Sequence, residues 1–257
     1  MDFLKSVRSA IYEMIGRDDR PIVVFSAAWP FLREMQQNDA TAVERLLDVL
    51  LDAVANRSLL MPTFTQGFVD GYCDLDKERS STGALSECFR NRPGVRRTLS
   101  AFFPFAVSGS AINEVIHLTP EHAWGEGSLY EWMEQRDVCF LMFGTHPTHS
   151  SYLHRFEWLA RDVIDYRFTK EFHGTLIREG VSVDVTETLY VRMQNPPVVN
   201  DFTVLLPFLK SAGMKTVTPH GVSIASYHAK AALATLGPVV AQDPLFVVKN
   251  RKDYEEL

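Results

Sequence analysis

Hydrophobic residues along the chain fall into short blocks whose spacing alternates between helical and strand-like. Apolar side chains recur every three or four positions over residues 3–15 and stop at Gly16, which predicts a helix. Pro21–Ser26 is short, β-branched and apolar on both faces, which is typical of a buried parallel strand. A second helix is expected over about residues 40–55 and a second strand over Leu59–Pro62. This order of elements predicts a layered α/β sheet.

The middle of the chain contains its clearest central strand, Val138–Phe143, and a helix is predicted after it over Ser151–Ala160. The elements predicted before that strand are a polar loop at Asp74–Thr82, a helix near Ala84–Asn91, strand-like runs at Arg97–Phe103 and Phe105–Ser108, and a tight turn at Gly125–Ser128 leading into a helix.

The last third of the chain changes character. Val181–Val191 alternates apolar and polar residues, which predicts an antiparallel pair with the preceding run Gly174–Arg178. Two helices and a strand at Lys215–Thr218 are expected next, before an apolar tail around Pro244–Val248. Because no linker, repeat or low-complexity tract interrupts the pattern, we predict one continuous domain over residues 1–257.

Composition and charge narrow the class of protein. The chain has 46% apolar and 23% charged residues, as in an ordinary globular protein. Its 26 Lys and Arg against 32 Asp and Glu give a net charge of −6, which argues against a nucleic-acid partner. No apolar run approaches the roughly 20 residues of a membrane helix. The N-terminal segment does not resemble a signal peptide, and three scattered cysteines favour a reducing, cytoplasmic compartment.

The richest polar cluster, residues 144–157, follows the central strand and enters the next helix, where open α/β sheets usually place their sites. His154 and Glu157 are three residues apart, so they share one helical face. A carboxylate beside an imidazole fixes its tautomer and raises its basicity, which suits a general base. The other interpretation is a hydrogen-bonded core histidine with a surface glutamate.

The same segment offers a metal site as an alternative. His146, His149, His154 and Glu157 together have the chemistry of zinc ligands and would suit a metal-dependent hydrolase. The HExxH pattern is absent, however, and Pro147 prevents a continuous helix from aligning the first two histidines. We therefore predict no metal and keep the hydrolase as the second hypothesis.

Two further places have chemistry that suits a phosphate. Ser26 ends the first strand in the manner of a phosphate-binding turn, although that turn lacks glycine. Arg96 and Arg97 stand beside Thr98, and a guanidinium binds phosphate oxygens through paired hydrogen bonds. The alternative is a solvated pair of arginines at the start of a strand.

The order of several short motifs resembles the antibiotic N-acetyltransferase family, whose best-known members are aminoglycoside 3-N-acetyltransferases. The resemblance begins at the strand ending in Ser26 and extends over nearly the whole chain. Its motifs are MPTFT at Met61–Thr65, G-x-L-x-E-x-x-R at Gly83–Arg90, the PG-x-x-RS-like element at Pro93–Thr98, GEGS at Gly125–Ser128 and LH-x-x-E at Leu153–Glu157.

The resemblance implies a three-layer α/β/α fold with a mixed central sheet and an antiparallel excursion in the C-terminal third. It implies an N-acetyltransferase that uses acetyl-CoA as cosubstrate, with His154 as general base and Glu157 as its orienting partner. Coenzyme A contacts are implied at Ser26, Ala27, Ala28, Arg97, Thr98 and Ser108. The implied acceptor is an amine of an aminoglycoside, as in antibiotic resistance, or of an amino sugar used in surface polysaccharides.

Three departures from the family pattern concern the donor and acceptor pockets. The segment after the RS-like element reads Leu99–Pro104 in place of the family's His-Pro-x-x-Ser, Ser150–Ser151 stands for Asn-Thr, and Ala27 follows Ser26 where a second serine is common. A non-catalytic relative that binds coenzyme A or sugar therefore remains a third hypothesis. A membrane partner is not expected, and a homodimer is left open.

Overall fold

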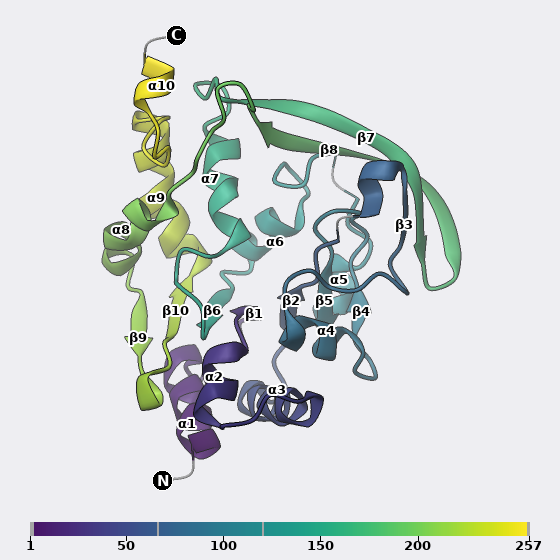
Figure 1. The fold of residues 1–257 in the computed structure, drawn as a ribbon, viewed down its shortest axis with the longest axis vertical. Helices are drawn as coiled ribbons and strands as arrows, with labels where there is room; N and C mark the ends of the chain where they lie inside the picture. The colour runs from purple at the N-terminus through teal and green to yellow at the C-terminus, as the bar shows by residue number, and fades with distance from the viewer. Residues whose placement is uncertain (1–2, 66, 120, 256–257) are drawn as a thin grey trace.

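A mixed central sheet organises the molecule. The computed structural model describes residues 3–65, 67–119 and 121–255. Seven strands of this sheet lie in the order β4-β5-β2-β1-β6-β10-β9 (Figure 1). They are β1 Ile22–Ser26, β2 Leu59–Pro62, β4 Arg96–Arg97, β5 Phe105–Ser108, β6 Cys139–Phe143, β9 Lys215–Val217 and β10 Ile224–His228. The neighbours of β1, which are β2 and β6, run parallel to it, whereas β5 and β10 are antiparallel to their partners. The predicted α/β class and mixed sheet are confirmed.

Helices cover both faces of this sheet and complete three layers (Figure 1). One layer contains α1 Phe3–Ile15, α2 Trp29–Glu34, α3 Ala40–Val54 and α4 Ala84–Arg90. The other contains α5 Ile112–Val115, α6 Leu129–Gln135, α7 His154–Leu159, α8 Leu206–Ser211, α9 Ala229–Gln242 and α10 Lys252–Glu255. Short 3-10 turns are η1 Gly67–Asp70, η2 Ser151–Leu153, η3 Phe202–Leu205 and η4 Pro219–Gly221.

Strand β6 shows why the apolar runs form the centre of the sheet. All five of its side chains are buried. Phe140 and Met142 pack into the cluster of the α6–α9 layer, while Cys139, Leu141 and Phe143 pack into the cluster of the α1–α4 layer. A strand covered by helices on both faces needs apolar residues at every position, which is the pattern the sequence has there.

A second, three-stranded sheet forms an arm beside the central one. It consists of β3 Tyr72–Asp74, β7 Arg167–Arg178 and β8 Val181–Arg192 in the order β3-β7-β8. The long β7–β8 hairpin curves away from the main body toward β3 (Figure 1). The predicted antiparallel pair is therefore confirmed and is longer than expected. A small apolar cluster that includes Phe68, Phe102 and Leu189 packs at the base of the arm.

The predicted strand Arg97–Phe103 is wrong beyond its first residue, because β4 ends at Arg97. The hydroxyl of Thr98 accepts a hydrogen bond from the amide of Phe105, which bends the chain back. The carboxylate of Glu187 then accepts bonds from the amides of Ala101 and Phe102. The side chain of Glu187 therefore accepts the backbone hydrogen bonds that a neighbouring strand would otherwise accept.

Several elements were not predicted from the sequence, among them α2, β3 and β10. Helix α2 begins with Trp29 and Pro30, and proline is tolerated there because the first turn lacks helical partners for its N–H groups. Strand β10 lies in a stretch for which no element was predicted, and β3 ends at Asp74, the first residue of the predicted polar loop. None of the described helices has the length and hydropathy needed to cross a bilayer.

Gly144 links β6 to the histidine-rich loop and has no room for a side chain. Its φ is +73°, and a Cβ there would overlap the ring of Phe31 and the carbonyl of Ala27. The ring of Phe31 is itself stacked on Phe143 at 4.1 Å between centroids, so it cannot easily move away. Gly94 has a similar φ of +78° but open space around it.

We expect Gly144→Ala to lower the free energy of unfolding by about 2–4 kcal/mol, from the left-handed backbone together with overpacking. Gly94→Ala is the matched control and should lose only about 1 kcal/mol, from the backbone alone. Denaturant unfolding of both variants measures the difference. If both variants lose the same free energy of unfolding, overlap with the ring of Phe31 does not destabilise Gly144→Ala.

Candidate active site

His154 lies at the first position of α7, immediately after the turn η2. The hydroxyl of Ser150 accepts a hydrogen bond from the backbone amide of Tyr152 and so caps that turn. Tyr152 and Leu153 are buried against the α6–α9 layer, which fixes the direction in which the helix starts. The predicted placement of His154 and Glu157 on one helical turn is therefore what the structure has.

The two side chains form a hydrogen-bonded dyad. Nδ1 of His154 lies 2.6 Å from Oε2 of Glu157. Because an ionised carboxylate only accepts hydrogen bonds, Nδ1 carries a proton, and in the neutral ring Nε2 keeps its lone pair. The side chain of His154 is 31% exposed, whereas that of Glu157 is 1% exposed. An oriented imidazole that reaches solvent beside a buried carboxylate is the arrangement of a general base.

Three residues distant in sequence hold the carboxylate of Glu157. The hydroxyl of Tyr166 donates to it at 3.0 Å, the amide of Asn200 at 3.0 Å, and Arg167 through Nε at 2.9 Å and Nη2 at 2.8 Å. Burial raises the pKa of Glu157, but the hydrogen bond and charge of His154 and the charge of Arg167 outweigh it, so this pKa lies at about 2. Glu157 is therefore an anion at neutral pH.

The dyad opens into a cleft of about 470 Å³, which we call the dyad cleft. Aromatic rings surround the histidine: Phe202 lies 4.9 Å and Trp124 5.7 Å from it between centroids, both edge-on. The rest of the lining comes from Phe103, Arg167, Leu189, Tyr190, Val191, Arg192, Gln194 and Asn200. The cleft can therefore place a small molecule against Nε2 of His154.

The four residues of the metal hypothesis do not come together. His146 and His149 face each other with 5.5 Å between ring centroids, and Nδ1 of His146 is bonded to the hydroxyl of Thr148. His154 and Glu157 bond to each other instead. Across the described ranges, no group of three or more His, Cys, Asp or Glu side chains is positioned to hold a metal ion.

Ser26, Ala27 and Ala28 lie where β1 ends and α2 begins. The amide of Ala27 donates to the carbonyl of Phe143 at 2.9 Å, so this turn is attached to the end of β6. The loop that leads to the dyad leaves from the same end of β6. The structure therefore places these three residues and the loop before His154 at one edge of the central sheet.

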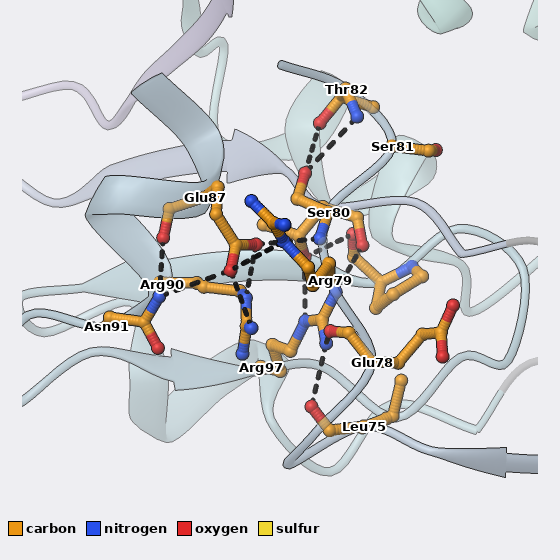
Figure 2. A network of polar contacts seen from close by, with 12 residues as sticks. Leu75, Glu78, Arg79, Ser80, Ser81, Thr82, Glu87, Arg90, Asn91 and Arg97 are labelled. Carbon is orange, nitrogen blue, oxygen red and sulfur yellow. Dashed lines mark hydrogen bonds and ion pairs between the residues drawn. The ribbon is translucent and has the colours of Figure 1, made fainter. Parts of the chain in front are cut away.

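Arg97 is buried and has polar contacts within its own chain (Figure 2). Its guanidinium donates to the carbonyls of Thr63 and Leu75, at 2.6 and 2.7 Å, and to the carbonyl of Glu78 at 2.7 Å. Burial lowers the pKa of Arg97 to about 10. In this structure the guanidinium holds the loop after β3, and its predicted contact with coenzyme A stays a prediction.

Thr98 and Ser108 lie at opposite ends of strand β5. Thr98 bonds to the backbone of Phe105, at the end of β5 that pairs with the end of β2. Ser108 pairs with Leu59, at the start of β2. The structure therefore does not bring Ser108 together with Ser26, because Ser26 is the last residue of β1, on the side of the sheet where β2 ends.

The G-x-L-x-E-x-x-R motif has a structural role that its sequence does not reveal. The carboxylate of Glu87 accepts two hydrogen bonds from the guanidinium of Arg90, at 2.7 and 2.8 Å. It also accepts a hydrogen bond from the backbone amide of Ser80 at 2.7 Å (Figure 2). The hydrogen bond from Arg90 lowers the pKa of Glu87 to about 2, against the effect of burial. The motif thus attaches α4 to the loop at residues 79–82.

Comparison with solved structures places the fold in one class. AAC(3)-IVa, an aminoglycoside acetyltransferase, aligns with a TM-score of 0.69 and 18% identity, covering 97% of this chain and 92% of its own. AAC-IIIb in a binary complex with CoASH gives 0.73 and 14%, covering 93% and 96%. AAC-VIa bound to sisomicin gives 0.74 and 17%, also covering 93% and 96%. These enzymes share the three-layer architecture.

The chain belongs to the aminoglycoside 3-N-acetyltransferase family, whose sequence profile matches residues 32–236. The resemblance of its motifs is thereby confirmed, and so is the predicted class of enzyme, an N-acetyltransferase. A search of curated proteins finds no significant match.

Because the pKa of Glu157 is lowered in the folded state, the free energy of unfolding should depend on pH. A carboxyl whose pKa falls below its ordinary value of 4.5 stabilises the folded state above that pH and loses this contribution as the pH falls toward 2. Glu157→Gln leaves Arg167 buried without a counter-charge, so we expect a loss of about 3–5 kcal/mol at neutral pH. The difference from the wild type should shrink below pH 4.5.

Unfolding measured against pH for both proteins tests this. Glu171→Gln is the control, since Glu171 is exposed and should change the free energy of unfolding by less than about 0.5 kcal/mol. A gap between wild type and Glu157→Gln that stays constant at all pH values would contradict the assignment.

Proposed function

We propose that the protein transfers an acetyl group from acetyl-CoA to an amine of an aminoglycoside or a related amino sugar, by direct attack. The observation that carries this proposal is the dyad: an imidazole with a free Nε2 beside a cleft, and a buried, ionised glutamate on Nδ1. Membership of an N-acetyltransferase family supports the reaction class.

The dyad supplies what aminolysis of a thioester needs. The amine nitrogen attacks the carbonyl carbon, a C–N bond forms, and the C–S bond to coenzyme A breaks. Nε2 of His154 accepts the proton that the nitrogen loses, and Glu157 stabilises the imidazolium formed. That proton is then available to the departing thiolate, so the ring returns to its starting state and no acyl-enzyme is required.

Acetyl-CoA is proposed to approach from the edge of the sheet where β1 and β6 end. Ser26, Ala27 and Ala28 lie at that edge, and small side chains there allow close approach to the backbone. Thr98 lies on the loop that follows β4, toward the same edge, and Arg97 holds the neighbouring loop in place. Ser108 is left out of this donor site because of its position at the other end of β5.

Two relatives support the assignment of ligands. AAC-IIIb was solved with CoASH and AAC-VIa with sisomicin, and both share this fold. CoASH is the product that the proposed reaction releases, and sisomicin is an aminoglycoside. We propose that the acceptor binds in the dyad cleft and that its reacting amine lies against Nε2 of His154.

We expect His154→Ala to lower the amine-dependent release of CoA thiol by roughly 10²–10⁴-fold, the range for a lost general base. Acetyl-CoA should still stabilise the variant in a thermal-shift assay, since the donor site is unchanged. His173→Ala is the matched control, because His173 is 68% exposed on β7, away from the dyad.

Turnover of His154→Ala near the wild-type rate would remove His154 from the role of base. Binding of acetyl-CoA by the wild type without turnover of any amine would favour the non-catalytic alternative.

A further inference from the structure

We propose that the acceptor is an amino sugar carrying an anionic group, such as a phosphate ester, with Arg192 as the residue that binds this anion. The inference rests on the proposed function, since it assumes that the acceptor occupies the dyad cleft. It restricts the acceptor to anionic amino sugars and assigns Arg192 as a residue that determines specificity.

The charge of the dyad cleft carries the argument. No Asp or Glu is among the described residues that line it. Of its two arginines, Arg167 is 5% exposed and pairs with Glu157, so the two charges compensate each other. Arg192 is exposed, and its one hydrogen bond to the described chain goes to the carbonyl of Val198 at 3.3 Å. The cleft therefore has a net positive charge at Arg192.

Arg192 lines the same cleft as His154. Arg192 pairs with Arg167 across the β7–β8 hairpin, so the two side chains leave the same face of the hairpin from directly opposite positions. Nη2 of Arg167 lies 3.3 Å from Nδ1 of His154. Because Glu157 compensates the charge of Arg167, Arg192 is the arginine of this pair whose charge can bind an anionic ligand.

A polycationic aminoglycoside fits this lining poorly. It carries several ammonium groups, and each one buried at the site needs an anionic or strongly accepting partner. The aromatic rings of Trp124 and Phe202 suit the one amine that reacts, and they offer flat apolar surfaces to a sugar ring. The lining has no carboxylate for the remaining ammonium groups.

The carboxylates of this region gather elsewhere. A separate cleft of about 560 Å³ shares no lining residue with the dyad cleft, and its charged lining consists of two arginines, Arg155 and Arg161, and four glutamates, Glu121, Glu126, Glu131 and Glu171. His154 does not line this acidic cleft. Polycation binding there would leave the reacting amine outside the cleft that holds the base. The arrangement favours an acceptor that brings negative charge to Arg192.

The test compares amino sugars that differ only in phosphate. Hexoses with the amine at C2, C3 or C4 are assayed by thiol release. Each is tested as the free sugar, as the 1-phosphate and as the uridine diphosphate-linked form, with gentamicin and sisomicin beside them. The 1-phosphate and nucleotide-linked arms distinguish a simple sugar phosphate from a nucleotide sugar. We expect a phosphorylated form to have a higher kcat/KM than the free sugar or either aminoglycoside.

Charge reversal at Arg192 tests the assigned residue. Arg192→Glu should raise KM for the phosphorylated acceptor by roughly tenfold or more with little change in kcat, and leave KM for the free sugar nearly unchanged. Added salt should likewise raise KM only for the phosphorylated form. The matched control is Arg45→Gln, an exposed arginine on α3 that lines neither cleft.

The outcomes separate this inference from the proposed function. Preference for an aminoglycoside, equal use of free and phosphorylated sugars, or an Arg192→Glu variant with unchanged KM would each overturn the inference while leaving the transferase in place. Release of thiol with none of the amines would overturn the proposed function itself, and the inference with it.

Discussion

The buried carboxylate of Glu157 is the group on which the site depends. It accepts hydrogen bonds from His154 on its own helix, from Tyr166 and Arg167 at the start of β7, and from Asn200 after β8. A charge this deeply buried is tolerated only when its bonds are satisfied. The orientation of the imidazole is therefore coupled to the docking of the second sheet, and the proposed base is oriented only when both parts of the fold are in place.

The central sheet supplies the fixed edge from which this site is built. Strands apolar on both faces, β1 and β6 above all, are covered by a helical layer on each side. Their ends place the turn after Ser26 next to the loop that leads to His154. Gly144 permits the close approach of these segments. The candidate donor side and the dyad thus lie near one another because two neighbouring strands end together.

An interaction could be predicted from the sequence when its residues are close together along the chain, and not when they are far apart. The dyad was predictable because His154 and Glu157 are three residues apart on one helix. The partners Tyr166 and Asn200 were not, since nothing local marks a residue that meets Glu157 only after the arm has folded. Arg97 shows the same difficulty: its guanidinium is bound by backbone carbonyls, which no sequence pattern displays. The β-branched and apolar runs predicted most of the strands, whereas β10, a short run of mixed character, was not predicted.

The central claim is that Glu157 holds the proton of His154 on Nδ1 and leaves Nε2 free to act as a base. ¹⁵N NMR of the histidine-labelled protein, at a pH where the ring carries one proton, measures this directly, with His154→Ala identifying the signals. We expect a protonated Nδ1 and an unprotonated Nε2. A proton found on Nε2 would leave no lone pair toward the dyad cleft and would contradict it.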